Sequence, residues 1–366
     1  MKCKKITIVA GARPNFIKIA PIIHSINKAN RRSNEIEYRL VHTGQHYDEN
    51  MSKSFFEQLD IPKPDINLEC SGGSQAEQTA AILINFEREL ISNPSDLVLV
   101  VGDVTSTMAC ALVAQKLKIK VAHVEAGIRS NDWSMPEEIN RLVTDSITNY
   151  FFTTTKSATQ HLINCGVDEK NVFFVGNTMI DTLLKHKSMF KKPNLWDTLE
   201  LSDKNYVIIT LHRPSNVDEQ ENLRKIIHEI IKSSHELKLI FPMHPRTYAI
   251  FKKLGISHER LKIVDPLPYL EFNYLVERSK LVITDSGGIT EETTVLGIPC
   301  ITLRDNTERP ETITIGTNEL IGKSPKKIPE YFQKLMNNSW KKGGIPELWD
   351  GNTSERIIKT IIKLKI

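Results

Sequence analysis

The sequence predicts an α/β protein that contains two doubly wound parallel sheets. Short apolar runs alternate with helix-length segments along almost all of the 366-residue chain, and the alternation restarts after a polar stretch at residues 187–204. Alternation at this spacing is typical of parallel sheets covered by helices. A chain of this length is expected to form about two domains, at roughly 150 residues each. The polar stretch is therefore the best candidate for a linker.

In the first half, residues 97–101 form a continuous apolar run, as expected of a strand buried on both faces of a sheet. The other strands are expected at residues 6–10, 38–43, 121–124, 151–154 and 172–175. Helices are expected at residues 16–29, 75–91, 108–117 and 136–149. Pro21 is expected to kink the first helix, because proline has no N–H to donate.

The second half repeats the pattern. Strands are expected at residues 207–211, 237–241, 281–284 and 300–303, with a further strand beginning at Ile263. Helices are expected at residues 220–234, 269–278 and 289–296. A terminal helix is expected at residues 354–366, with Ser354 as its N-cap.

Composition excludes several classes of protein. The chain carries 48 Lys and Arg against 44 Asp and Glu, and a net charge of +4 does not indicate a nucleic-acid partner or a membrane surface. No run approaches the ~18 apolar residues that a membrane helix needs. Gly11 and Pro14 interrupt the first apolar run, so no leader is expected. Five cysteines without a CxxC pair predict reduced thiols in a cytoplasmic protein. They are Cys3, Cys70, Cys110, Cys165 and Cys300.

Charged, histidine or glycine residues follow six of the predicted strands. They lie at residues 11–14, 102–103, 125–127, 212–213, 243–246 and 285–288. Open α/β sheets bind ligands beyond the carboxyl ends of their strands. These positions therefore predict a ligand site.

Two of these loops suit an anion. The segment DSGG at residues 285–288 leads into a helix, where small residues let a phosphate approach unpaired backbone N–H groups. The same segment is equally consistent with a plain strand-to-helix turn. GARP at residues 11–14, with Lys18 one turn later, is the second loop, although Arg13 alone is more often a salt-bridge partner. The chain lacks GxGxxG and GxxxxGK[ST], which argues against NAD and ATP.

Three carboxylates are expected around one predicted strand-end region, namely those of Asp103, Glu125 and Glu137. Crowding separates carboxyl pKa values, so that one group can act as a base and another as an acid. Glu137 and Glu138 are alternatively explained as partners of a helix dipole. Glu125 is harder to explain structurally, because a carboxylate directly after a buried strand is costly without a partner.

His212 and His244 end two strands of the second half. A lone histidine there is more often structural, but two beside a glycine-rich loop favour a ligand site. HxxH, HExxH and cysteine clusters are absent from the sequence, so no metal site is expected. A GxSxG nucleophile motif is also absent.

Together these segments closely resemble the non-hydrolysing UDP-N-acetylglucosamine 2-epimerase family. The motifs occur in family order and span nearly the whole chain. They are GARPNFIK (11–18), GDVTST (102–107), HVEAGIRS (123–130), MPEEINR (135–141), GN (176–177), LHR (211–213), HPR (244–246), TDSGGITEE (284–292), NTERPET (306–312) and WDG (349–351) with Arg356.

The resemblance implies a GT-B type fold with two Rossmann-like domains across a cleft, and a homodimer. The implied boundaries are 1–180 for a domain with catalytic carboxylates, 181–350 for a UDP-binding domain, and 351–366 for a helix that crosses back. The implied reaction is reversible inversion at C2 of a UDP-amino sugar without a cofactor, for surface polysaccharide synthesis. UDP leaves to give a 2-acetamidoglycal and then adds back.

Family motifs assign catalysis to Asp103, Glu125, Glu137 and His212. Which carboxylate takes the C2 proton stays open. Glu292 is expected to hold the ribose hydroxyls, and Phe272 to lie near uracil. The full implied UDP-binding set is Arg13, Lys18, His244, Phe272, Ser286, Gly287, Gly288, Glu292 and Arg309.

The chain departs from the family pattern in three places. HRPSN at residues 212–216 replaces HRxEN, the spacing from Glu125 to Glu137 is short, and TGQHYD at residues 43–48 differs from the stretch that forms an allosteric site in some members. Allosteric activation is therefore not carried over. The alternatives are a 2-epimerase for another UDP-sugar, such as a 2,3-diacetamido uronic acid, a hydrolysing 2-epimerase, a GT-B glycosyltransferase, and a non-catalytic sensor.

Overall fold

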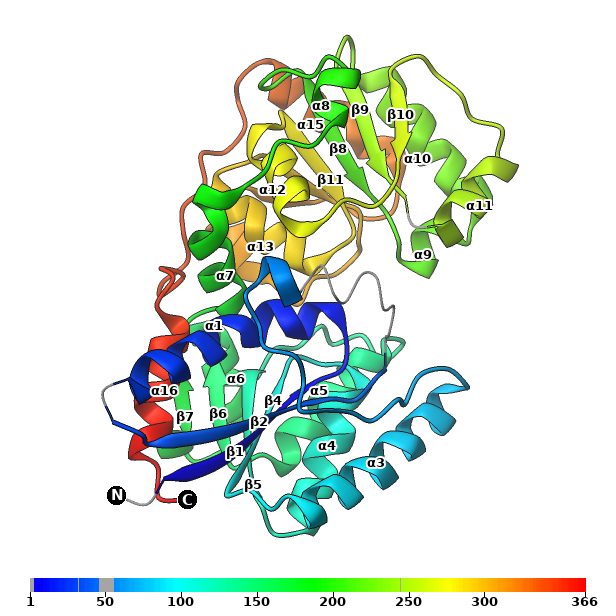
Figure 1. The fold of residues 1–366 in the computed structure, drawn as a ribbon. Coiled ribbons are helices and arrows are strands. Elements are labelled where there is room, and N and C mark those ends of the chain that lie inside the picture. The colour runs from blue at the N-terminus through cyan, green and yellow to red at the C-terminus, as the bar shows by residue number, and fades with distance from the viewer. Residues whose placement is uncertain (1–2, 32, 46–55, 244) are drawn as a thin grey trace. The chain divides into compact units, whose positions relative to one another are not determined.

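The chain forms two compact α/β units (Figure 1). The computed structural model describes residues 3–31, 33–45, 56–243 and 245–366. Unit 1 comprises Met1–Lys185 together with Glu347–Ile366, and unit 2 comprises His186–Pro346. Each unit has its own sheet and its own buried core.

Unit 1 contains a seven-stranded sheet in the order β3-β2-β1-β4-β5-β6-β7, and all its described strand pairs are parallel. This confirms the parallel sheet predicted for the first half. The strands are β1 (Lys4–Ala10), β2 (Ile36–His42), β3 (Ile66–Asn67), β4 (Leu97–Val101), β5 (Lys120–Ala126), β6 (Tyr150–Thr153) and β7 (Val172–Phe174).

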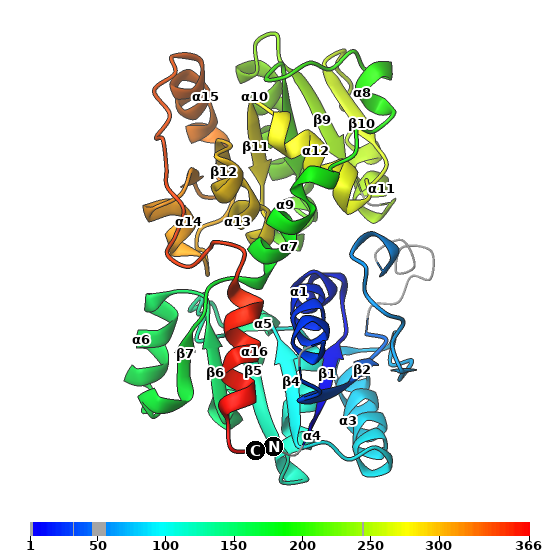
Figure 2. The same cartoon turned by 60° about the vertical axis from the view of Figure 1, so that its left-hand side comes forward.

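Helices cover both faces of this sheet. On one face α3, α4 and α5 pack side by side, whereas α1 and α16 lie side by side elsewhere in the unit (Figure 2). The helices are α1 (Arg13–Asn30), α3 (Gln75–Ser92), α4 (Thr105–Lys116), α5 (Pro136–Ile147), α6 (Lys156–Asn164), α7 (Thr178–His186) and α16 (Thr353–Lys363), with a 3-10 turn at Glu169–Asn171.

Unit 2 contains a six-stranded parallel sheet in the order β10-β9-β8-β11-β12-β13, which confirms the second predicted sheet. The strands are β8 (Tyr206–Thr210), β9 (Lys238–Pro242), β10 (Leu261–Val264), β11 (Leu281–Thr284), β12 (Cys300–Thr302) and β13 (Asn318–Leu320). The helices are α8 (Leu195–Thr198), α9 (Pro214–Val217), α10 (Gln220–Ser233), α11 (Pro245–Lys253), α12 (Tyr269–Arg278), α13 (Gly287–Leu296), α14 (Pro310–Thr314) and α15 (Ile328–Met336), with 3-10 turns at Lys187–Met189 and Pro325–Lys327.

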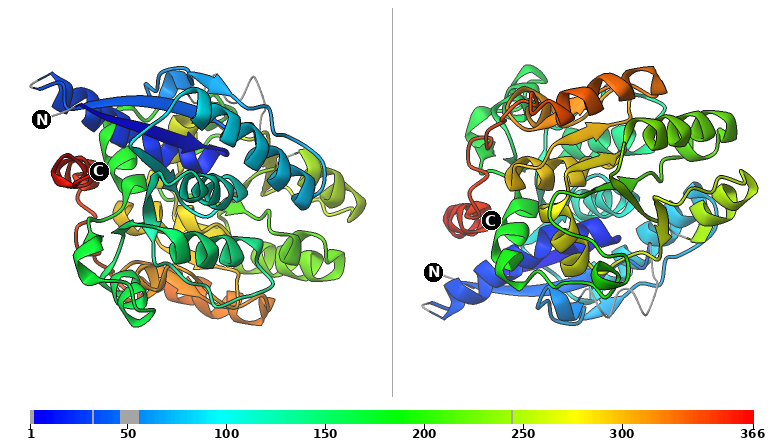
Figure 3. Two further views of the ribbon diagram at one scale, coloured as in Figure 1. Left: turned by 90° about the horizontal axis from the view of Figure 1, so that it is seen from below. Right: turned by 90° about the horizontal axis from the view of Figure 1, so that it is seen from above.

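The cores follow from apolar strands and amphipathic helices. Every residue of β4 is buried, as its unbroken apolar run predicts. In unit 2, α10 and α15 lie side by side (Figure 3) and contribute isoleucine, leucine and phenylalanine side chains to one core cluster. Among the described helices, none combines the length and apolar character needed to span a membrane.

Helix α1 continues through Pro21 because another residue supplies the missing hydrogen bond. Proline at this position cannot donate to the carbonyl four residues earlier, which belongs to Ile17. The Thr182 hydroxyl of α7 donates to that carbonyl instead, at 2.6 Å. The proline is therefore accommodated by a hydrogen bond between α1 and α7.

The last twenty residues complete unit 1. Lys4 at the start of β1 donates to the carbonyls of Ile361 and Ile362 at 2.8 and 2.6 Å, which joins the first strand to the end of α16. Ser354 is not the N-cap that the sequence suggested. The helix begins at Thr353 after Asn352, because Asp181 of α7 accepts the backbone N–H groups of Thr353 and Ser354 at 3.0 and 2.7 Å.

Candidate active site

The residues expected to bind ligand follow the strands at which each sheet reverses its order. In unit 1 the order reverses between β1 and β4, and in unit 2 between β8 and β11. Gly11 and Gly102 come after the first pair of strands, while His212 and Asp285 come after the second. Such switch points are where open α/β sheets bind ligands. Each unit therefore carries predicted site residues at its own switch point.

Glu125 lies inside β5 in a rare backbone conformation. Its φ angle is +74°, and the pairing of β5 with β6 shifts register between Val124 and Ala126. The predicted end of the strand at Val124 was therefore wrong, because β5 continues past a bulge to Ala126. Bulges re-aim side chains and are frequent beside functional sites, where backbone strain also collects.

Lys18 neutralises Glu125 within unit 1. The Lys18 Nζ lies 2.7 Å from each carboxylate oxygen of Glu125, and the two side chains are only 6% and 4% exposed. Gly102 makes room for this pair. Its φ angle is +67°, and a Cβ atom there would lie 2.9 Å from the Lys18 Nζ. The cation therefore holds Glu125 as a buried carboxylate.

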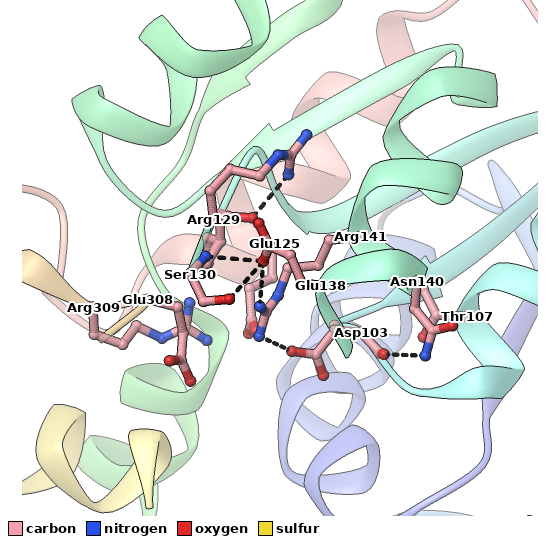
Figure 4. Close-up of polar contacts among 12 residues, drawn as sticks. Asp103, Thr107, Glu125, Arg129, Ser130, Glu138, Asn140, Arg141, Glu308 and Arg309 are labelled. Carbon is pink, nitrogen blue, oxygen red and sulfur yellow. Dashed lines mark hydrogen bonds and ion pairs between the residues drawn. The ribbon is translucent and has the colours of Figure 1, made fainter. Parts of the chain in front are cut away.

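Asp103 belongs to a second charge network, in which it is half-buried and Arg141 and Glu138 are buried (Figure 4). Arg141 of α5 pairs with the Asp103 carboxylate through Nη2, and its Nη1 donates to Glu138 at 2.9 Å. Glu138 also accepts the backbone N–H groups of Ser130 and Asn131, at 2.9 and 3.1 Å. Burial alone would raise the pKa of Glu138, but these donors outweigh it and lower the pKa. Glu138 is thus an ionised anchor for Arg141.

The neighbouring Glu137 is placed differently. It lies exposed in the first turn of α5, one residue before the buried Glu138. Because successive helical residues point in different directions, the network takes Glu138 and leaves Glu137 accessible to solvent. Arg13, the first residue of α1, is half-buried.

In unit 2, His212 rests on the buried carboxylate of Asp285. The His212 Nδ1 lies 2.8 Å from Asp285 Oδ1, while the His212 side chain is 60% exposed. Asp285 also accepts the Arg213 backbone N–H at 3.0 Å and the Asn216 amide at 3.1 Å. Burial would raise the pKa of Asp285, but the hydrogen bond and charge of His212 and the other donors lower it. Asp285 therefore orients an imidazole whose other edge is accessible.

The segment after β11 leads directly into helix α13. Helix α13 begins at Gly287, two residues before the predicted start at Ile289, because the glycines already have helical geometry. The N-cap Ser286 makes no side-chain cap bond, and Ser286, Gly287 and Gly288 are partly exposed. Their N–H groups can meet an anion at the positive end of the helix dipole.

Glu292 and Tyr269 form a buried pair behind this loop. The Tyr269 hydroxyl donates to Glu292 Oε1 at 2.9 Å, and both side chains are buried. Burial raises the pKa of Glu292 to about 7, although the hydrogen bonds of Tyr269 and Asn273 oppose the rise. Glu292 is therefore a carboxyl group that changes charge near neutral pH.

The remaining predicted UDP-binding residues are more scattered in unit 2. Phe272 of α12 is partly buried and packs against the core cluster on that side of the sheet. Arg309 precedes α14 and pairs with the buried Glu291 at 2.6 Å. His244 lies outside the described residues. Of the described residues, none form a group of three or more His, Cys, Asp and Glu side chains suited to a metal ion.

Sequence reasoning missed two partners in unit 1. Arg141 links Asp103 to Glu138, and the buried His123 links Asp145 to Gly102. Glu138 and Arg141 stand three residues apart on a predicted helix, a spacing that lets side chains meet. The three-residue spacing from Glu138 is therefore the sequence feature that could have predicted the role of Arg141.

The chain matches the family model described as UDP-N-acetylglucosamine 2-epimerase over residues 28–362. It is 41% identical to the UDP-N-acetylglucosamine 2-epimerase of Methanocaldococcus jannaschii over 98% of each chain. It is 37% identical to the UDP-2,3-diacetamido-2,3-dideoxy-D-glucuronate 2-epimerase of Pseudomonas aeruginosa, over 98% of this chain and 100% of that protein.

Solved structures of UDP-GlcNAc 2-epimerases have the same fold. One from M. jannaschii, in complex with UDP-GlcNAc and UDP, has a TM-score of 0.87 at 41% identity and covers 98% of this chain and 99% of that chain. One from Neisseria meningitidis, bound to UDP-GlcNAc, has a TM-score of 0.89 at 32% identity and covers 98% and 100%. These neighbours support the GT-B type fold. The chain thus belongs to the UDP-N-acetylglucosamine 2-epimerase family and is an epimerase.

Proposed function

We propose that this epimerase interconverts UDP-N-acetylglucosamine and UDP-N-acetylmannosamine by inverting C2 of the amino sugar. The observation that most supports the proposal is the buried Glu125, which has a strained backbone and pairs with Lys18 beside Gly102, the residue that precedes Asp103. The relatives named for this substrate share about two fifths of the sequence over the full length.

The reaction needs an elimination, because the C2 hydrogen of the sugar is not next to a carbonyl group. We propose that the C1–O bond to UDP breaks and its electron pair leaves with the diphosphate. A base takes the C2 proton, and a C1=C2 double bond forms. UDP then returns to C1 of the 2-acetamidoglycal while a proton is delivered to the opposite face of C2. The atoms balance, because UDP and one proton leave and return.

Unit 1 is proposed to supply the acid and base groups. Asp103, Glu125 and Glu137 are the candidate carboxylates, and general acid–base catalysis of this kind contributes roughly 10²–10⁴-fold to a rate. Before substrate arrives, Glu125 is paired with Lys18. Asp103 is paired with Arg141. Lys18 also stays a candidate UDP contact.

Unit 2 is proposed to hold UDP and to stabilise its departure. The backbone N–H groups at Ser286, Gly287 and Gly288 would donate to the diphosphate, and His212 and Arg13 are proposed as further contacts of the departing UDP. Glu292 would accept hydrogen bonds from the ribose hydroxyls. Phe272, His244 and Arg309 complete the proposed UDP-binding set.

Incubation with UDP-N-acetylglucosamine in D₂O tests the reaction directly. Proton NMR should show deuterium entering C2 together with formation of the manno epimer. The Glu125→Gln variant should lose roughly 10²-fold or more of the exchange rate, as expected for loss of an acid–base group. An exposed control, Glu330→Gln on α15, should behave as wild type. Unchanged sugar with no label at C2 would rule out this substrate.

A UDP-diacetamido uronic acid is the second candidate substrate. The P. aeruginosa relative is named for such a sugar, and this chain carries Ser215 at the glutamate position of the HRxEN motif. Comparison of kcat/KM across a panel of UDP-sugars in D₂O decides between the two. Free reducing sugar as the main product would indicate a hydrolysing enzyme, and transfer to an added acceptor without change at C2 would indicate a glycosyltransferase.

We further propose that the product serves polysaccharide synthesis and that the chain acts as a homodimer. Exposed isoleucines on α3 support self-association, since Ile84 and Ile91 are 50% and 63% exposed. They lie seven residues apart and therefore on one helical face. Light scattering after gel filtration should give a dimer mass, and an Ile84→Lys/Ile91→Lys variant should shift it toward the monomer. A wild-type monomer would contradict the dimer.

A further inference from the structure

His123 is a buried histidine that contacts Gly102, the residue before Asp103. It lies in β5, two residues before Glu125, and its side chain is 0% exposed. The His123 Nδ1 is 2.8 Å from Asp145 Oδ1, and its Nε2 is 2.8 Å from the Gly102 carbonyl oxygen. Both ring nitrogens therefore have a close partner.

Both partners can only accept hydrogen bonds. A backbone carbonyl has no proton to give, and an ionised carboxylate has none either. Asp145 is ionised, because it pairs with the guanidinium group of Arg129, which is always charged. It also accepts the Gly127 backbone N–H at 3.1 Å and Arg129 Nη1 at 2.6 Å.

We propose that His123 is a buried imidazolium ion that serves as a positioning residue for Asp103. In neutral imidazole one ring nitrogen is an acceptor and would face a second acceptor at 2.8 Å. The doubly protonated ring satisfies both contacts. Charge-assisted hydrogen bonds are also the stronger kind, so the ring holds the Gly102 carbonyl firmly.

The Gly102 peptide passes this constraint to Asp103. The Gly102 N–H donates to the Val124 carbonyl at 3.0 Å, so the residue is fixed through both its N–H and its C=O. Gly102 also has a left-handed φ angle that only glycine adopts readily. The next residue is Asp103, whose backbone carbonyl accepts from Asn140 at 2.9 Å. His123 therefore fixes the direction in which the Asp103 side chain leaves the backbone.

The protonation state is tested without any assay of activity. In protein labelled with ¹⁵N-histidine, long-range ¹H–¹⁵N spectra near pH 7.5 should show one histidine with both nitrogens in the imidazolium range, whereas an ordinary histidine of pKa ≈ 6.5 is mostly neutral there. Its signals should vanish in His123→Gln and persist in the exposed control His228→Gln. An unprotonated nitrogen in the His123 signals would overturn the proposal.

The positioning role rests on the proposed epimerase reaction and needs a kinetic test. His123→Gln should lower kcat by roughly 10²-fold, the effect expected of about 1 Å of misplacement, while KM for the UDP-sugar changes much less. Asp145→Asn should act similarly, and the double variant should lose little more than either single one, as expected of coupled residues. Val113→Ala on α4, which removes core packing in the same unit, controls for lost stability.

Failure of the positioning role can be distinguished from failure of the proposed epimerase reaction. A His123→Gln enzyme whose kcat falls no further than that of an equally destabilised Val113→Ala enzyme would overturn the positioning role. Additive losses in the double variant would do the same. If wild-type protein turns over no UDP-sugar, the proposed function fails, while the spectra still decide the charge of His123.

Discussion

At the scale of single residues, the Lys18–Glu125 pair has a measurable energetic signature. Removing one partner of a buried ion pair strands the other charge and costs about 3–5 kcal/mol. Lys18→Met should therefore lower the free energy of unfolding by about that amount in urea titrations. Lys18→Met/Glu125→Gln should recover most of the loss, because neither charge remains buried.

The control lies on the same helix. Lys28 of α1 pairs with Glu355, but its side chain is 61% exposed. Exposed pairs contribute roughly 0–1 kcal/mol, so Lys28→Met should be nearly neutral. A double variant as unstable as Lys18→Met alone would show that the lost stability comes from packing of the lysine stem.

Glu292 should make stability depend on pH around neutrality. Its pKa rises from 4.5 unfolded to about 7 folded, so the folded state binds the extra proton between these values. The contribution of Glu292 to the free energy of unfolding is therefore fully present below about pH 4.5 and is lost as pH rises through 7. The change is roughly 3 kcal/mol, at about 1.4 kcal/mol per pKa unit.

Glu292→Gln isolates this effect, because its amide keeps an acceptor for the Tyr269 hydroxyl. The melting temperature of ligand-free wild-type protein should fall relative to the variant between about pH 4.5 and 7. Other titrating groups act on both proteins and cancel in the difference. Parallel melting curves across this range would contradict the raised pKa.

The sequence predicts which types of residue follow the strands, but it does not predict which neighbouring group each side chain contacts. The MPEEINR segment places Glu137 and Glu138 side by side, and the sequence offers no reason to prefer one for the interior. The choice is made by the Ser130 and Asn131 N–H groups, which the loop after β5 points at Glu138. Similarly, Lys18 was expected to meet an anionic ligand and meets Glu125.

At the scale of elements, the start of α13 depends on Gly287 having no side chain. A Cβ atom there would lie 2.8 Å from Glu308 Oε1, and Glu308 is held by Arg304 at 2.7 Å. Gly287→Ala should therefore disturb the helix N-terminus and weaken binding of UDP by about tenfold, which corresponds to 1.4 kcal/mol. Titration calorimetry with UDP measures this loss.

Gly344→Ala is the matched control in the same unit. A Cβ atom at Gly344 would meet its nearest neighbour at 3.6 Å, an ordinary contact. UDP affinity should then stay at the wild-type value. Equal affinity for Gly287→Ala and wild type would argue against a diphosphate at this helix end.

Most element centres follow from local sequence, whereas several ends do not. The spacing of apolar residues predicts both ends of the helix at Tyr269–Arg278, and the unbroken apolar run predicts both ends of the strand at Leu97–Val101. The extension of β5 to Ala126 depends on a bulge beside β6, which no local pattern encodes. The start of α13 differs because glycine has low helix propensity and reads as a loop residue, although its N–H groups are needed there.

At the scale of the whole molecule, unit 1 is assembled from the two ends of the chain. Residues 347–366 return to it after the whole of unit 2, and Trp349 donates its indole N–H to Thr154 at 3.1 Å. Composition and periodicity predicted a terminal helix but not where it packs, because that depends on contacts more than 170 residues apart. Only the family resemblance implied that the terminal helix packs against the first half of the chain.

Asp181 is the residue through which this return can be tested. It caps α16 from α7 by accepting two N–H groups, and loss of a cap costs about 1–2 kcal/mol. Asp181→Ala should therefore speed amide hydrogen exchange in α16 and in α1, which packs beside it, while unit 2 keeps its protection. Asp168→Ala, which removes an exposed cap in the same unit, should change exchange only near its own turn. If Asp181→Ala leaves α16 as protected as in wild type, the helix is held by its apolar face alone, through Ile357, Ile358 and Ile361.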